Sequence, residues 1–211
     1  MPITSFEDKV AAITGAGSGM GRALAEALAS RHCHVAISDI DPQALAETHE
    51  RINSIQKANV SSHELDVADR QQVEQFASDV VNEHGKVNMV FNNAGVSVTD
   101  TAENMPYEDF EWLMNINFWG VIYGCKSFLP HFHEVEEAHI INTSSIFGIV
   151  AVPSQSAYNA SKFAVRGYSY AMRQELLDSH IGVSCVQPGG IKTNIIKSSR
   201  YTTADKTAAT K

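Results

Sequence analysis

Short apolar segments alternate with amphipathic segments along most of the chain, a pattern typical of an α/β protein. The segments that predict strands are 9–14, 34–37, 60–67, 87–91, 139–142 and 181–186. The segments with helical periodicity are 19–30, 42–55, 69–85, 107–132 and 158–179. Repeated strand–helix units favour a parallel sheet with helices on both faces. Right-handed crossovers then predict a doubly wound, Rossmann-like sheet of six strands.

The same pattern divides the chain into one domain and a tail. Residues 1–195 form the predicted Rossmann-like domain, and residues 196–211 are polar without apolar periodicity. We expect that tail to be flexible, because it offers little apolar surface to bury.

Composition excludes several classes of protein. Hydrophobic residues make up 44% and charged residues 19%, as in ordinary soluble domains. The net charge of −8 argues against nucleic-acid binding, which needs a basic face. No apolar run approaches the roughly 20 residues that span a bilayer, and the first ten residues lack a signal-peptide pattern. Cys33, Cys125 and Cys185 have no CxxC spacing. We therefore expect a cytoplasmic protein with reduced thiols.

A glycine-rich turn, TGAGSGMG at 14–21, connects the first predicted strand to the first predicted helix. Glycines permit a tight turn and let backbone N–H groups approach a pyrophosphate at the positive end of a helix. The spacing differs from G-x-G-x-x-G, and such a sequence alone fits a simple tight turn equally well. Its position between a strand and a helix favours a dinucleotide site, with Gly15, Ser18, Gly19 and Met20 as contact residues.

Asp39 ends the second predicted strand, where a carboxylate can accept both hydroxyls of an adenosine ribose. A 2′-phosphate about 4 Å away would be repelled by roughly 4 kcal/mol at an effective dielectric constant of 20. The sequence therefore predicts NAD(H) rather than NADP(H). The alternative is that Asp39 only caps the next helix, although Asp41 is better placed for that role.

The chemistry is predicted by Tyr158 and Lys162, which are one helical turn apart, with Ser145 thirteen residues earlier. A cation beside a phenol favours the phenolate, so we expect Lys162 to lower the pKa of Tyr158 and make it an acid or base near neutral pH. Separately, each residue type is common in structural roles, and Ser144 is an alternative to Ser145. Asn117 occupies an unfavourable place inside a helix, which suggests a special function.

Together these motifs resemble the short-chain dehydrogenase/reductase family over about residues 6–195. The matching residues are TGAGSGMG at 14–21, Asp66-Val67, Asn92-Asn93-Ala94-Gly95, Asn117, Ser144-Ser145, Tyr158-Asn159-Ala160-Ser161-Lys162 and Pro188-Gly189-Gly190-Ile191-Lys192-Thr193. The resemblance implies an oxidoreductase that exchanges hydride with a secondary alcohol or ketone. It also implies a seventh strand and a substrate lid. Neither is evident in the sequence, which predicts an abbreviated form or an incomplete chain.

The resemblance assigns a role to each catalytic residue. Tyr158 would be the general acid or base, and Lys162 would bind the nicotinamide ribose and lower the pKa of the tyrosine. Ser145 would hydrogen-bond the substrate oxygen, and Asn117 would hold a water in a proton relay to Lys162.

The remaining family positions imply contacts to the dinucleotide. Asp66 would contact the adenine amino group, Val67 would lie beside it, and Asn93 would face the adenosine. Ile191 and Thr193 would meet the nicotinamide carboxamide. Asn92 and Asn93 also fit a simple turn after a strand.

Three further expectations concern partners. Residues 112–129 and 160–177 are apolar on more than one side, which predicts a homodimer or homotetramer. Val96, Ile146, Phe147, Val150 and Val152 would border the substrate, so an apolar alcohol or carbonyl compound is favoured. The nine histidines form no compact ligand set, so no metal site is predicted.

Two other functions share these motifs. A nucleotide-binding regulator could keep the fold without turnover, and the short lid region favours it. An epimerase or dehydratase would use NAD transiently, although such proteins generally carry a different glycine spacing.

Overall fold

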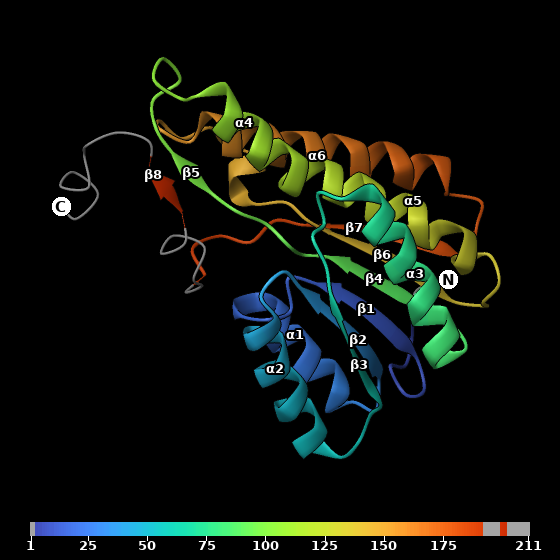
Figure 1. Cartoon of the computed structure of the whole chain (residues 1–211). Helices are drawn as coiled ribbons and strands as arrows, with labels where there is room; N and C mark the ends of the chain where they lie inside the picture. The colour runs from blue at the N-terminus through green and yellow to red at the C-terminus, as the bar shows by residue number, and fades with distance from the viewer. Residues whose placement is uncertain (1–2, 192–198, 202–211) are drawn as a thin grey trace.

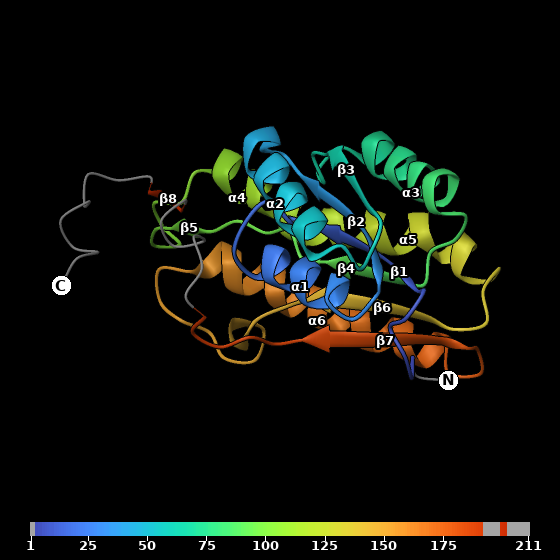
Figure 2. The same ribbon diagram turned by 90° about the horizontal axis from the view of Figure 1, so that it is seen from below.

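The structure is a computed structural model that describes residues 3–191 and 199–201. Its main sheet has six parallel strands in the order β3-β2-β1-β4-β6-β7 (Figures 1 and 2). These strands are β1 (Val10–Thr14), β2 (His34–Asp39), β3 (Val60–Glu64), β4 (Met89–Asn92), β6 (Ala138–Thr143) and β7 (Ile181–Val186). The predicted doubly wound α/β fold is confirmed.

Helices cover both faces of the sheet (Figure 1). They are α1 (Gly19–Ala29), α2 (Pro42–Ile55), α3 (Arg70–His84), α4 (Tyr107–Met114), α5 (Gly120–Phe132) and α6 (Ser156–Glu175). The expected single helix over 107–132 is interrupted by a π-helical segment, Asn115–Trp119. Asp41 and Asp69 cap α2 and α3, since each side chain accepts two backbone N–H groups of the first turn.

The continuous apolar strands are explained by burial on both faces. In β1, Val10 and Ala12 belong to a core with α3, α5 and α6. The alternate residues Ala11 and Ile13 belong to a second core with α1 and α2. Side chains of one strand point alternately to opposite faces, so a single apolar run supplies both cores.

The strand order places a crevice at the carboxyl end of β1. Both neighbours of β1 are parallel to it, and β4 lies on the side opposite β2. The strand order therefore reverses between β1 and β4, where doubly wound sheets bind ligands. The glycine turn after β1 meets the loop after β4 there, because the Cβ position at Gly15 is 2.8 Å from the Cα of Ala94.

A ladder of buried polar side chains crosses the sheet behind this crevice. Asn92 of β4 donates to the Asn142 amide oxygen of β6 at 2.8 Å, and Asn142 donates to the Ser169 hydroxyl of α6 at 3.0 Å. Ser169 donates in turn to the Val165 carbonyl at 2.7 Å. Gly124 gives α5 close access, since its Cβ position is 2.0 Å from Asn92 Oδ1. The ladder ties β4, β6 and α6 together.

A second, two-stranded sheet joins β5 (Val98–Thr99) to β8 (Arg200–Tyr201) beside α4 (Figure 1). The sequence analysis predicts neither strand. Residues 196–211 are expected to form a flexible tail, but residues 200–201 pair with a loop a hundred positions earlier. Two-residue strands leave no periodicity to detect, so only tertiary contacts define them.

Two findings concern compartment and membrane. The cysteines Cys33, Cys125 and Cys185 are free thiols, and burial raises the pKa of Cys33 and Cys125 to about 12. Across residues 3–191 and 199–201, no helix has the length and apolar character needed to cross a membrane.

Candidate functional site

The glycine turn is shaped by positive backbone angles and by close packing. Gly15 and Gly19 have φ angles of 65° and 53°, which favour glycine. A Cβ at Gly21 would lie 2.1 Å from the Gly15 carbonyl oxygen, so only glycine lets α1 start this close to β1. Ser18 is the N-cap of α1 but makes no side-chain cap hydrogen bond. The first-turn N–H groups therefore suit an anion.

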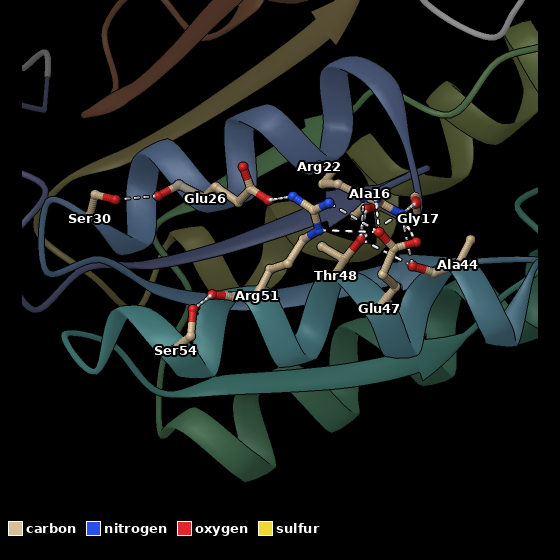
Figure 3. Close-up of polar contacts among 10 residues, drawn as sticks. All are labelled: Ala16, Gly17, Arg22, Glu26, Ser30, Ala44, Glu47, Thr48, Arg51 and Ser54. Carbon is tan, nitrogen blue, oxygen red and sulfur yellow. Dashed lines mark hydrogen bonds and ion pairs between the residues drawn. The ribbon is translucent and has the colours of Figure 1, made fainter.

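Side chains behind the turn hold its carbonyl groups (Figure 3). The buried Thr48 hydroxyl donates to the Ala16 carbonyl at 3.0 Å, and the Arg22 guanidinium donates to the Gly17 carbonyl. In a trans peptide, the C=O and the following N–H point in opposite directions. Thr48 and Arg22 thereby fix the orientation of the peptide N–H groups of Gly17 and Ser18, of which the Gly17 N–H donates to Asp39.

The sequence analysis missed this network. Glu47 of α2 accepts from Arg22 at 2.8 Å, and Thr48 accepts from the Arg22 Nε at 2.9 Å. Arg51 makes a further ion pair with Glu47 at 3.2 Å (Figure 3). An arginine directly after Gly21 was the available signal, but its partners come from a helix some 25 residues later.

Asp39 lies beside the glycine turn, and its two oxygens each accept one backbone N–H. Oδ2 accepts from Gly17 at 2.8 Å, and Oδ1 accepts from Asp41 at 3.0 Å. Asp41 itself caps α2 by accepting from Gln43 and Ala44. The capping alternative for Asp39 is therefore wrong. A carboxylate has about four acceptor sites, so Asp39 retains acceptors for further donors.

Asp66 and Val67 follow β3, Asn93 follows β4, and the three residues have different partners. Asp66 Oδ1 accepts from the Ala68 N–H at 2.9 Å, and Val67 is buried. The Asn93 amide donates to the Thr14 carbonyl at 2.9 Å, and the Thr14 hydroxyl accepts the Asn93 N–H at 3.0 Å. Asn93 thus fixes the end of β4 to the end of β1. Contact of these residues with a dinucleotide stays a prediction.

Tyr158 and Lys162 lie together on α6, as their spacing predicts. The Lys162 ammonium is 5.5 Å from the centroid of the Tyr158 ring and donates to the Thr143 carbonyl at 3.0 Å. The Cβ position at Gly95 is 3.5 Å from the same ammonium and 3.3 Å from Asn117 Oδ1. The pair therefore borders the loop that meets the glycine turn.

Ser145 and Ser144 have different hydrogen-bond partners. Ser145 is the N-cap of a 3-10 turn, Ile146–Gly148, and its hydroxyl accepts the Phe147 N–H at 3.2 Å. Its side chain also faces Tyr158. The buried Ser144 hydroxyl instead donates to the Lys162 carbonyl at 2.8 Å. Ser144 supports α6, and Ser145 is the hydroxyl next to the phenol.

The protonation of this pair differs from the expectation. Burial raises the pKa of Tyr158, and the nearby Ser145 side chain opposes that rise in part. Burial also lowers the pKa of the Lys162 ammonium to about 8. The predicted lowering of the Tyr158 pKa by Lys162 is therefore not found, because the shift is an increase caused by removal from water and only Ser145 acts against it.

Asn117 is fully buried in the π-helical segment. Its Oδ1 accepts the Val96 N–H at 2.8 Å, and its Nδ2 donates to the Val96 carbonyl at 2.9 Å. The oxygen and the nitrogen of the Asn117 amide therefore both hold the loop after β4. A π-helical turn disturbs the regular backbone ladder and is frequent at functional sites. The water relay assigned to Asn117 stays a prediction.

The turn after β7 closes this side of the site. The Ile146 N–H donates to the Pro188 carbonyl at 2.9 Å, which brings the Pro-Gly-Gly turn beside the 3-10 turn of Ser145. Ile191 follows and is 50% exposed. The predicted contact residue Thr193 lies outside the described residues. No three potential metal ligands gather anywhere in the described part of the chain.

Comparison with known proteins identifies the group to which these features belong. A family model described as short chain dehydrogenase matches residues 9–204. A Mycobacterium tuberculosis relative named SadH, described as an oxidoreductase, is 48% identical over 197 residues, covering 92% of this chain and 71% of its own.

Two solved structures are similar over most of the chain. A short chain dehydrogenase/reductase from Burkholderia phymatum in complex with NAD has a TM-score of 0.90 and 36% identity, with 93% of this chain and 70% of that chain covered. An alcohol dehydrogenase from Thermococcus sibiricus complexed with 5-hydroxy-NADP has a TM-score of 0.85 and 28% identity, with 91% and 80% covered.

We predict that the buried ammonium makes stability depend on pH. Between about pH 8 and 10.5, unfolded chains hold a proton on Lys162 that folded chains have released. The free energy of unfolding therefore rises with pH in this window. Relative to Lys162→Met, the wild-type protein should gain up to about 3 kcal/mol across it, measured by urea unfolding.

Lys126→Met, at an exposed lysine of α5, is the control and should leave the pH dependence unchanged. Parallel pH profiles for wild type and Lys162→Met would contradict the burial of a charged group.

Proposed function

The chain belongs to the short-chain dehydrogenase family of oxidoreductases, and from this premise we propose that it transfers a hydride between NAD(H) and a secondary alcohol or ketone. One observation supports the proposal: Ser145 lies next to Tyr158, Tyr158 lies next to Lys162, and the Lys162 ammonium lies beside Gly95 in the loop that meets the glycine turn. A phenol, a hydroxyl and an ammonium suit an alcohol or carbonyl oxygen, whose proton must be exchanged during the reaction.

The residues at the crevice fit a dinucleotide. The N–H groups at the start of α1 would hold the pyrophosphate, and Asp39, which also accepts the Gly17 N–H, would accept the hydroxyls of the adenosine ribose. A side chain at Gly95 would fill the space between Asn117 and Lys162. Lys162 and Tyr158 would therefore hold the nicotinamide end, and Ile191 would border it.

Cofactor choice follows from the charge at the ribose position. Asp39 places a partly exposed carboxylate there, and the neighbouring cation Arg22 is already paired with Glu47. A 2′-phosphate would meet a like charge without a free cation among these contacts. The NAD complex of the Burkholderia phymatum protein supports this choice, and the 5-hydroxy-NADP complex of the Thermococcus sibiricus protein is the counter-example in the family.

When bound, the nicotinamide supplies or accepts the hydride. The protein residues manage the oxygen and its proton. Ser145 would donate a hydrogen bond to the substrate oxygen, and Tyr158 would exchange the proton with it. Lys162, with its pKa of about 8, stays cationic at pH 7 yet can release its proton slightly above neutrality. Lys162 and Asn117 would then form the route by which the proton passes between Tyr158 and water.

The proposed substrate is apolar on the side next to Ser145. Ile146, Ile149 and Val150 follow this serine and are 43%, 45% and 49% exposed. Exposed aliphatic side chains next to a polar catalytic centre favour a ligand with an apolar body and one polar oxygen.

The first test is Tyr158→Phe, assayed with a panel of secondary alcohols with NAD and ketones with NADH. Loss of the phenolic hydroxyl should reduce kcat at least about a hundredfold, because no other group exchanges the substrate proton. The dissociation constant for NAD, measured by calorimetry, should stay within about threefold. Tyr170→Phe, on the same helix, should retain activity.

Turnover retained in Tyr158→Phe would refute the role of this residue. A wild-type protein that binds NAD but converts no member of the panel would instead favour the regulator.

Asp39→Ala tests the choice of cofactor. Removal of the carboxylate should lower the ratio of the NADP and NAD dissociation constants by about ten- to a thousandfold, because the repulsion of the 2′-phosphate disappears. Asp41→Ala is the control two residues later. It should cost about 1 kcal/mol of stability through loss of the helix cap while the ratio stays constant. An unchanged ratio in Asp39→Ala would reject this explanation.

We also propose that α5 and α6 form an interface between copies in a homodimer or homotetramer. Trp119, at the start of α5, and Phe163 of α6 are 45% and 41% exposed, although both are large and apolar. Light scattering at micromolar concentration should give a multiple of the monomer mass. Phe163→Glu should shift it toward the monomer, whereas Tyr107→Glu on α4 should not. A monomeric wild-type protein would overturn the proposal.

A further inference from the structure

Tyr158 belongs to a small apolar cluster that is separate from the two main cores. Its fully buried members are Val98 of β5, Leu113 of α4 and Ala157 of α6. The partly buried side chains packed against them are Val96, Met105, Phe110, Trp112 and Tyr158. The position of the catalytic phenol therefore depends on how β5, α4 and the first turn of α6 are held together.

The Arg200 side chain packs against the outer side of this cluster. Its guanidinium lies 3.5 Å from the centroid of the Trp112 ring, and one of its nitrogens is 2.9 Å from Asp109 Oδ1. Its backbone N–H donates to the Ser97 carbonyl at 3.1 Å, and the strand β8 that it begins pairs with β5. One residue near the end of the described chain thus joins α4 to β5.

Further hydrogen bonds connect Ser97, which accepts from the Arg200 N–H, to the start of α6. The Ser97 hydroxyl donates to Gln155 Oε1 at 3.3 Å, and Gln155 Nε2 donates to the Thr99 hydroxyl at 2.8 Å. Gln155 directly precedes α6, and its carbonyl accepts the Asn159 N–H at 2.7 Å. The side chain of Gln155 is therefore fixed from β5, while its backbone begins the helix that carries Tyr158.

We propose that Arg200 is a positioning residue for Tyr158, acting through Trp112 and Asp109 on one side and through Ser97 and Gln155 on the other. Arginine suits the task because a planar guanidinium can stack on an indole and pair with a carboxylate at the same time. The predicted effect of Arg200 on catalysis rests on the function proposed above. Its predicted effect on the order of the first turn of α6 is independent of that function.

The test compares Arg200→Ala with Arg70→Ala, which removes an exposed arginine paired with Glu74 at the start of α3. Amide hydrogen exchange reports local opening without any substrate. In Arg200→Ala, peptides covering 97–99 and 155–159 should exchange on the order of tenfold faster, while those of α2 should not change. Arg70→Ala should match the wild-type protein in all of these peptides.

A second pair of variants separates the two contacts of the guanidinium. Asp109→Asn removes the ion pair and keeps the stacking, and Arg200→Lys keeps a cation but loses the planar group. In a protein whose second tryptophan is replaced by Trp119→Phe, the emission of Trp112 should shift in Arg200→Ala. The shift should be smaller in Asp109→Asn, because the stacked guanidinium remains.

Kinetics then distinguish positioning from general destabilisation. With any alcohol that the wild-type protein oxidises, Arg200→Ala should lower kcat on the order of tenfold through misplacement of the phenol. The dissociation constant for NAD should stay unchanged, and Arg200→Lys should restore part of the rate.

Unchanged exchange at 155–159 in Arg200→Ala would overturn the proposal. Equal losses of rate in Arg200→Ala and Arg70→Ala would do the same. If neither the wild-type protein nor Arg200→Ala turns over any substrate, only the proposed oxidoreductase function fails. The exchange and fluorescence results still decide the role of Arg200.

Discussion

The arrangement of residues at the site depends on one buried ammonium group, that of Lys162. Lys162 is 3% exposed, and removing such a charge from water is costly unless polar groups receive it. The Thr143 carbonyl at the end of β6 supplies one acceptor, and Ser144 fixes the Lys162 backbone from the next residue. Gly95 leaves space beside the ammonium and Asn117. The end of β6, helix α6 and the loop after β4 thus surround a buried charge. Because such a charge is costly, selection for stability alone would not retain it.

Strong periodicity made most of the fold predictable from the sequence. All six predicted strands are present in the main sheet, and α2 has the predicted limits because Pro42 begins it after the cap of Asp41. The proximity of Tyr158 and Lys162 follows from helical spacing alone. Such features are local, so neighbouring residues are sufficient to specify them.

The features that the sequence did not reveal all depend on distant partners. The π-helical turn at Asn117 replaces part of a continuous apolar helix, and its amide pairs with a loop twenty-one residues earlier. The contacts of Arg22 are with Glu47 and Thr48 of α2, and the residues next to Arg22 in the sequence do not reveal them. The pKa of Tyr158 was misjudged because pairing with Lys162 is visible in the sequence, whereas the degree of burial is not.

The amide ladder beneath the site has a consequence for how the sheet assembles. The Asn92–Asn142 and Asn142–Ser169 hydrogen bonds form only when β4, β6 and α6 meet in a single alignment. A shift by one residue along either strand would bury these amides among aliphatic side chains without partners. Apolar strands of similar sequence could otherwise slide past one another at little cost. The ladder therefore favours the observed register of β4 and β6, at whose ends the Lys162 site is built.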